Sequence, residues 1–218
     1  MNYPLTIIDD FFEDPDGIVE IANSLQYTPT EDGRWPGART PTLSESNPDL
    51  FAYLGNKIHN IFYMRPFSWR MMMHFQKIQP FHENVWNKKN RGWVHQDPHP
   101  FGGIIYLNKN PEINTGTSIF RVKKGFARMK DEDLRCKESL YLEQDIPQEQ
   151  YDSHWDNVNN QFIETITVEN VYNRLLLFDG SCYHGVKTFG SQERLTLNFF
   201  GLEVGEVPFT PLQRMKTQ

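Results

Sequence analysis

Hydrophobic residues recur with a helical period in the first third of the chain. After Asp14-Pro15, and again after Asn47-Pro48, apolar side chains return every three or four residues. Asp or Asn before proline is typical of a helix start, because the side chain can cap the first turn and proline fits its first position. The pattern predicts helices over residues 15–26 and 48–63, each with one apolar face, after a short strand at residues 5–9.

From Phe67 onward the pattern changes to short extended runs that are separated by turn residues. The predicted strands are near residues 68–78, 92–97, 102–108, 117–123, 162–168, 173–179, 184–188 and 193–202. Short strands at this spacing are typical of a sandwich or a barrel. We therefore expect a mainly β (α+β) protein with a double-stranded β-helix, or jelly-roll, core. The N-terminal helices should pack on one face of this core.

The length of the chain is sufficient for one sizeable domain. We expect residues 1–218 to form it, with a strand and helices in 1–66 and the jelly-roll core in 67–202. An insertion at 125–160 is polar, charged and unusually long for a connection. It is either a lid or binding loop, or a solvated excursion without function. Residues 34–41 are rich in Pro and Gly, which predicts a structured loop.

The segment Trp93-Val94-His95-Gln96-Asp97 carries the first candidate site. In an extended strand His95 and Asp97 point to the same face, so an imidazole and a carboxylate can bind one metal ion. The best candidate for a third ligand is His184, which follows an apolar strand and a tight turn. Two histidines and one carboxylate form the facial triad of non-haem Fe(II) oxygenases, which leaves coordination positions open for a co-substrate and O₂.

The H-x-D spacing occurs a second time, at His154 and Asp156. A motif this short arises easily by chance. The second pair lies inside the polar insertion, whereas His95 and Asp97 lie in a segment that is predicted to be a strand. Because precise sites are built on rigid elements, we favour the first pair.

Polar and apolar residues alternate along the strand that begins near Arg194, ten residues after His184. One face carries Arg194, Thr196 and Asn198, and the other carries Leu195, Leu197 and Phe199. A guanidinium beside a hydroxyl can bind a carboxylate, since arginine offers paired donors. The alternative is a salt bridge on an exposed sheet face, which would be preferred for an isolated arginine.

Several motifs follow one another between roughly residues 68 and 202. Their order is H-x-D, G-G-x-x-Y-L-N, G-x-x-x-F, R-L-L-L-F-D, the distal His and then R-x-T. This order resembles the prolyl-4-hydroxylase-like branch of the 2-oxoglutarate/Fe(II) dioxygenases, and the combination is more specific than any one motif. The resemblance implies that His95, Asp97 and His184 hold Fe(II), that O₂ is a co-substrate, and that the enzyme hydroxylates a C–H bond of a small molecule or a peptide or prolyl substrate.

The same resemblance implies residues that bind the co-substrate. Arg194 would bind the distal carboxylate of 2-oxoglutarate, Tyr106 would assist it, and Thr196 would add a hydroxyl contact. One departure concerns the strand before H-x-D. Many relatives have a tyrosine just before a proline there, whereas this chain has Gln79-Pro80.

Three further residues are candidates for contact with the substrate. Trp35 and Arg39 lie in the Pro-Gly-rich loop, which resembles the N-terminal part of uncharacterised members of this superfamily, and His99 lies two residues after Asp97. Tryptophan offers a stacking face and arginine a charge at the mouth of the site. A turn that is pinned by a packed tryptophan would explain the loop equally well.

Composition limits which binding partners and which cellular compartment we expect. The formal charge of −6 disfavours nucleic acid, which usually requires a basic surface. Two cysteines are too few for a disulfide framework or a thiolate zinc site, so we expect a reducing cytoplasm. No basic segment precedes an apolar core at the N-terminus, and no run of about 18 apolar residues occurs, so no membrane association is expected. The sequence does not indicate an oligomeric state.

Two other functions remain open at this point. A non-catalytic jelly-roll module would bind a ligand without metal, and it would not need three metal ligands together with Arg194. A cupin-like enzyme would use Zn or Mn without 2-oxoglutarate, and it would not need an arginine clamp.

Overall fold

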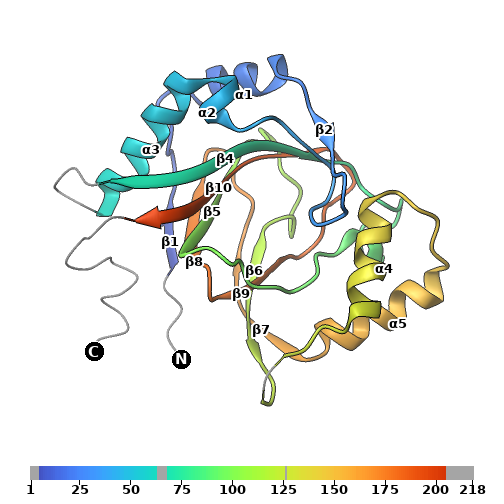
Figure 1. Cartoon of the computed structure of the whole chain (residues 1–218). Helices are drawn as coiled ribbons and strands as arrows, with labels where there is room; N and C mark the ends of the chain where they lie inside the picture. Colours follow the sequence, from blue (N-terminus) through green and yellow to red (C-terminus); the bar gives the residue numbers. More distant parts are fainter. Residues whose placement is uncertain (1–4, 63–67, 126, 205–218) are drawn as a thin grey trace.

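The computed structural model describes residues 5–62, 68–125 and 127–204 (Figure 1). Its strands are β1 Leu5–Ile8, β2 Thr28–Pro29, β3 Ala38–Arg39, β4 Trp69–Ile78, β5 Phe101–Tyr106, β6 Thr117–Val122, β7 Phe162–Val168, β8 Leu175–Asp179, β9 Tyr183–Val186 and β10 Arg194–Val204. Within these ranges one sheet has seven strands, in the order β1-β8-β5-β10-β4-β3-β2, and a smaller sheet has the order β7-β6-β9. The pairings are antiparallel, and the predicted jelly-roll is confirmed.

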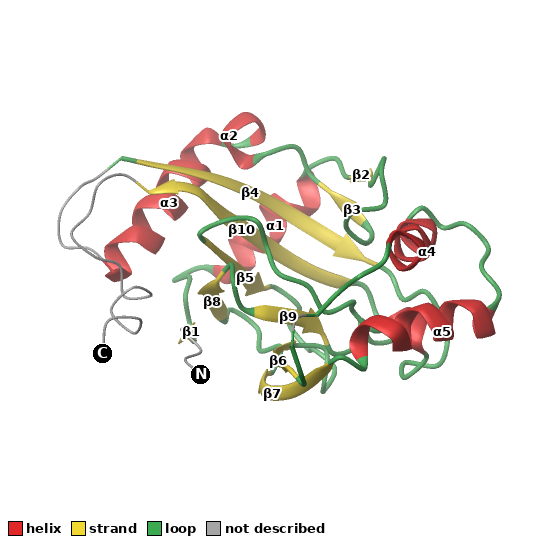
Figure 2. Ribbon diagram, turned by 60° about the horizontal axis from the view of Figure 1, so that its bottom comes forward, coloured by secondary structure: helices red, strands yellow, loops and turns green. Residues whose placement is uncertain are grey.

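Three helices lie along one face of the larger sheet (Figures 1 and 2). They are α1 Pro15–Ser24, α2 Leu43–Ser46 and α3 Pro48–Phe62. Asp14 caps α1 by accepting a hydrogen bond from the backbone N–H of Gly17. The buried faces of the helices share one apolar core with the sheet, which includes Leu54, Met73 and Leu197. The two predicted helices are thus present, although residue 63 lies outside the described residues.

The opposite face of the larger sheet points toward the smaller sheet. Along β10, Leu195, Leu197 and Phe199 belong to the core under the helices, while Arg194 and Asn198 line a cavity on the other side. This is the two-residue alternation expected of a strand that is covered on both faces. The alternation sets which polar side chains reach the interior.

The insertion at 125–160 contains two helices that were not predicted. They are α4 Asp131–Tyr141 and α5 Gln148–Asn159, which pack against each other beside the open end of the jelly-roll (Figure 2). Their apolar side chains form a second core with Trp93, whose indole Nε1 donates a hydrogen bond to the hydroxyl of Tyr151, 2.8 Å away. The prediction of a solvated excursion is therefore wrong.

Two local predictions also require correction. Residues 92–97 do not form a strand; His95 makes only an isolated bridge to His184. The loop at 34–41 includes β3, which pairs with β2 and with β4. The sequence also gave no sign of α2 or of the 3₁₀ turn Lys88–Asn90. Among the described residues, no helix combines the length and the apolar character that crossing a membrane requires.

Candidate metal centre and cavity

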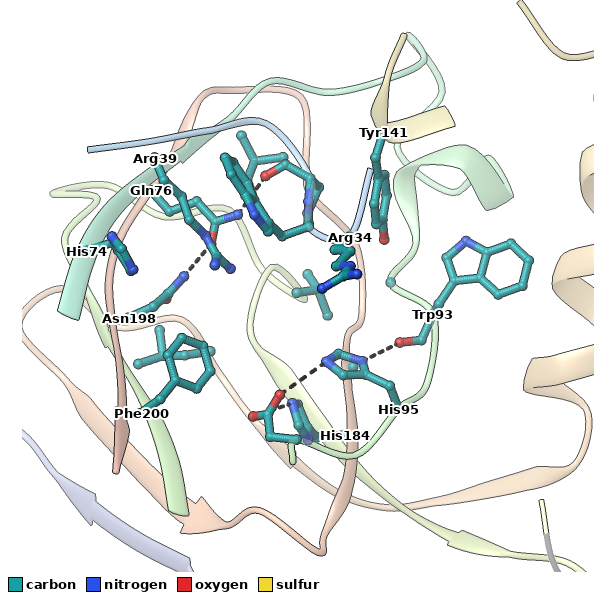
Figure 3. A pocket seen from close by; sticks show the side chains of 18 of the residues that line it. Arg34, Arg39, His74, Gln76, Trp93, His95, Tyr141, His184, Asn198 and Phe200 are labelled. Atoms are coloured by element: carbon teal, nitrogen blue, oxygen red, sulfur yellow. Dashed lines mark hydrogen bonds and ion pairs between the residues drawn. The ribbon is translucent and has the colours of Figure 1, made fainter. Parts of the chain in front are cut away.

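The side chains of His95, Asp97 and His184 converge. Figure 3 shows the two histidine rings side by side. One possible ligand atom from each residue lies within 4.8 Å of the others. Nε2 of His95 is 3.8 Å from Oδ1 of Asp97, and Nε2 of His184 is 3.5 Å from Oδ2. In the described part of the chain, no other group of three His, Cys, Asp or Glu side chains converges in this way. The three residues that the sequence singled out are therefore brought together.

Backbone hydrogen bonds hold the three residues in position. The amide of His95 donates to the carbonyl of His184 at 3.0 Å, and the amide of His184 donates back at 2.9 Å. The amide of Asp97 donates to the carbonyl of Gly180 at 3.0 Å. A Cβ on Gly180 would lie 1.8 Å from the carbonyl oxygen of His99, so only glycine fits this close approach.

Each histidine has its Nε2 free to bind a metal. Nδ1 of His95 lies 2.9 Å from the carbonyl oxygen of Trp93, and Nδ1 of His184 lies 3.0 Å from that of Cys182. Because a carbonyl only accepts, Nδ1 carries the hydrogen and Nε2 keeps its lone pair. Burial within the cavity walls lowers the pKa of His95 to about 3, and burial also lowers the pKa of His184 although Asp97 opposes the shift. Both rings are neutral at physiological pH, as metal binding requires.

A cavity of about 780 Å³ opens above these ligands. Its size falls in the range of small-molecule sites. Strands β4 and β10 contribute His74, Gln76, Arg194, Asn198 and Phe200; the loop at 34–41 contributes Trp35 and Arg39; helix α4 contributes Lys137 and Tyr141. The insertion thus supplies one wall of the cavity.

Arg194 is a buried cation on the inner face of β10, and its side chain lines the cavity. Nε donates to the carbonyl of Thr115 at 3.2 Å, but Nη2 has no hydrogen-bond partner among the described residues. The hydroxyl of Thr196, also buried, has none either. Burial lowers the pKa of Arg194, although the neighbouring Tyr106 opposes the shift. Because Arg194 is buried and forms no ion pair within the described ranges, the surface salt-bridge interpretation is wrong.

Tyr106 is completely buried beside Arg194. Its hydroxyl donates to Oγ1 of Thr117 at 2.8 Å, and its ring centroid lies 5.5 Å from the guanidinium carbon of Arg194. Burial raises the pKa of the phenol, so it stays neutral. Tyr106 therefore packs beside the guanidinium of Arg194 and helps to hold it in position.

Gln79, which stands where many relatives have a tyrosine, lies outside the cavity. Gln79 donates to Oε2 of Glu193 at 2.7 Å on the exposed side of the molecule, and it does not line the cavity. The polar residues of β4 that do so are His74 and Gln76, which sequence reasoning missed. Alternation along β4 was a usable signal for them, but the sequence did not reveal which face of β4 points inward.

The three candidate substrate residues all line the cavity. Trp35 and Arg39 lie together, with the guanidinium carbon 4.5 Å from a ring centroid of Trp35, and the ring of His99 lies 5.4 Å from that of Phe200. The second H-x-D pair lies elsewhere, in α5. His154 contacts Asp133 at 2.9 Å, and Asp156 accepts a hydrogen bond from Lys88.

Comparison with protein families gives one match, which spans residues 1–200 and is described as a family of unknown function (DUF6445). The chain belongs to this family. A comparison with curated proteins finds no significant match. Membership of the family therefore assigns no reaction, and the evidence on function comes from the site.

Several solved structures share this fold. A Pseudomonas putida prolyl-4-hydroxylase is 14% identical with a TM-score of 0.53, over 94% of this chain and 95% of that one. HygX from Streptomyces hygroscopicus, with nickel and 2-oxoglutarate bound, is 14% identical with a TM-score of 0.56, over 96% and 85%. A 2OG-Fe(II) oxygenase family protein from Burkholderia pseudomallei is 11% identical with a TM-score of 0.53, over 93% and 86%. At these identities the likeness establishes the fold.

Proposed function

We propose that this protein is a 2-oxoglutarate- and Fe(II)-dependent oxygenase that hydroxylates a C–H bond of a small molecule or peptide. The observation that carries the proposal is one cavity with both a His-Asp-His cluster and the buried guanidinium of Arg194, whose Nη2 has no partner among the described residues. Neither feature alone would distinguish this function from its alternatives.

The residues present fit Fe(II). Two neutral imidazoles and one carboxylate would supply three ligands, a set that leaves coordination positions for a co-substrate and O₂. HygX, which has the same fold, was solved with iron bound. The carbonyls behind His95 and His184 keep both rings oriented toward the metal position.

The residues present also fit 2-oxoglutarate. A buried guanidinium with an unpaired N–H is costly until an anion pairs with it. The distal carboxylate of 2-oxoglutarate would satisfy Nη2 of Arg194, which lines the cavity, and we propose that it also reaches the buried hydroxyl of Thr196, which is not itself among the lining residues. A zinc or manganese enzyme of the cupin kind does not need a buried carboxylate site, so Arg194 favours the oxygenase.

With Fe(II) bound, the chemistry supplied is oxidation of substrate C–H to C–OH, coupled to conversion of 2-oxoglutarate and O₂ into succinate and CO₂. The protein residues have three roles. The triad would hold the metal, Arg194 and Thr196 would orient the co-substrate, and residues of both sheets and of α4 would surround the substrate.

Anaerobic titration of the Fe(II)-loaded protein with 2-oxoglutarate tests the proposal, because chelation to Fe(II) gives a weak visible charge-transfer band. We expect Arg194→Gln to bind Fe(II) normally but to need at least about tenfold more 2-oxoglutarate for the band. A hydrogen bond to a charged group is worth about 1.5–3 kcal/mol. Arg70→Gln is the matched control, because Arg70 is exposed and paired with Glu203.

Each other result points to a specific alternative. A band that forms at the same 2-oxoglutarate concentration in Arg194→Gln would contradict the clamp. Metal binding without a band in the unmodified protein would favour a cupin-like enzyme. Failure to bind metal would favour a ligand-binding module.

A further inference from the structure

A second arginine, half-buried, lines the cavity on the wall across from the metal ligands. Figure 3 shows Arg39 beside Gln76 and Asn198, away from His95 and His184. Arg39 is in β3, where it pairs with Gln76 of β4, and Asn198 is on β10, the next strand. All three side chains line the cavity, so three elements build this cluster together.

The protein leaves the guanidinium of Arg39 mostly unsatisfied. Of its five N–H donors, one makes a long hydrogen bond of 3.4 Å from Nη2 to Oε1 of Gln76. Nε has no partner, and Arg39 forms no ion pair among the described residues. Burial lowers its pKa to about 10, so the group remains charged at neutral pH. Asp97 is the acid that opposes this shift.

The hydrogen bonds around Gln76 fix which atom of Asn198 is free. The carbonyl of Pro36 only accepts, so the bond of 2.6 Å to it must come from Nε2 of Gln76. Oε1 of Gln76 then faces Asn198, which must donate through Nδ2. The Oδ1 of Asn198 is left without a partner in the described residues. The side chain with this free acceptor therefore shares Oε1 of Gln76 with the guanidinium of Arg39.

Aromatic rings flank this pair of groups. The guanidinium carbon of Arg39 lies 4.5 Å from a ring centroid of Trp35 and 5.9 Å from the ring of Phe200. Stacking of this kind holds the guanidinium flat and leaves its edge for a planar anion. The cluster is therefore preorganised, rather than a flexible surface arginine.

Building on the proposed oxygenase function, we propose that Arg39 binds a carboxylate of the substrate and that Oδ1 of Asn198 accepts a hydrogen bond from an N–H on the neighbouring carbon. The co-substrate does not account for both arginines. One carboxylate of 2-oxoglutarate goes to the metal and its single distal carboxylate can pair with Arg194, which leaves Arg39 for another anion. The substrate class is thus an α-amino acid, either free or as the C-terminal residue of a peptide.

Calorimetry on the protein saturated with Mn(II) and 2-oxoglutarate tests this assignment without turnover. The probes are a panel of free L-amino acids and N-acetylated tripeptides with free C-termini, each compared with its C-terminal amide. We expect at least one acid to bind at least about tenfold more tightly than its amide, since the amide lacks the charge. Binding among the free amino acids or among the peptides identifies the source of the carboxylate.

Arg39→Gln should bind the acid as weakly as the amide, and Arg39→Lys should keep part of the preference because it keeps the charge. Arg70→Gln, an exposed arginine outside the cavity lining, should leave the preference unchanged. The inference is overturned if no probe binds, if acid and amide bind equally, or if Arg39→Gln keeps the preference.

The same titrations separate this inference from the proposed function. Repeated on metal-free protein without 2-oxoglutarate, they test carboxylate binding independently of the metal, and the Arg39→Gln and Arg194→Gln variants show which arginine binds the acid. Loss of the acid preference in Arg39→Gln together with failure of 2-oxoglutarate to bind would reject the oxygenase and keep the anion site. Loss of acid binding only in Arg194→Gln would show that the acid occupies the clamp and would reject the site at Arg39.

Discussion

Each histidine of the candidate metal centre is oriented by the carbonyl two residues before it in the chain. Trp93 holds His95 and Cys182 holds His184, at 2.9 and 3.0 Å. Because both contacts are local, each ring is oriented as soon as its own segment folds. The carboxylate of Asp97 then determines whether the two rings form a binding site, since it contributes the charge that attracts a divalent ion.

Replacement of Asp97 by Ala should therefore remove metal binding. We expect the affinity for Fe(II) or Mn(II) to fall by more than the roughly 10–100-fold that is typical of losing a supporting partner, because a ligand itself is lost. Asp156→Ala is the control, since it removes the carboxylate of the other H-x-D pair and breaks only the contact with Lys88. Calorimetric titration would contradict the assignment if the two variants bound metal alike.

At the scale of elements, the loop that contains β3 and the helix α4 form one continuous wall of the cavity. Gly33, with φ of +70°, lies directly against α4: a Cβ there would be 2.5 Å from the carbonyl oxygen of Glu138. The loop carries Arg39 and Trp35, and α4 carries Lys137 and Tyr141, so their contact fixes the width of the cavity.

Gly33→Ala should destabilise the protein through this contact. Gly125 offers a matched control, because its φ is +67° but a Cβ there would meet nothing within 4 Å. Both variants carry the cost of an unfavourable backbone conformation, and only Gly33→Ala must also move the loop away from α4. We expect Gly33→Ala to lose about 1–3 kcal/mol more in urea unfolding. Equal losses would mean that the loop and α4 are not tightly packed.

At the scale of the whole molecule, several histidines are kept neutral by burial. Burial lowers the pKa of His59 in α3 and of His74 in the cavity, as it does for the two candidate ligands. In each case the unfolded chain binds a proton at a pH where the folded protein does not. Proton binding therefore favours unfolding below the ordinary histidine pKa of 6.5.

The free energy of unfolding of the metal-free protein should fall as the pH drops from 7.5 to 5.5. Stability is fully present above 6.5 and is lost as the pH falls toward the lower folded-state pKa values. A buried histidine such as His59 contributes at most about 1.4 kcal/mol per pH unit. Urea unfolding at both pH values measures the loss, and His59→Gln should lose less stability between them. Equal stability at both pH values would contradict the expectation.

The parts of the site that could be predicted are those with a local signature. His95 and Asp97 were identifiable from the H-x-D spacing and the order of the motifs, although their segment is not the predicted strand, and Arg194 was identifiable from the alternation along β10. Gln76 and Lys137 were not, because their roles depend on which face of β4 points inward and on where the insertion packs. The sequence pattern did not predict helices α4 and α5, because only a few of their residues are buried and most of the segment is polar.

Trp93 connects the insertion to the candidate metal centre, because its backbone carbonyl contacts one and its indole contacts the other. Its carbonyl holds the ring of His95, and its indole is held by Tyr151 of α5. Thermodynamic linkage then runs in both directions, so an ion that tightens His95 should also slow amide hydrogen exchange in α5. The insertion at 125–160, which supplies one wall of the cavity, is therefore coupled to the metal centre. We expect a chimera that carries the insertion of a relative to differ in metal affinity as well as in the range of substrates that it binds.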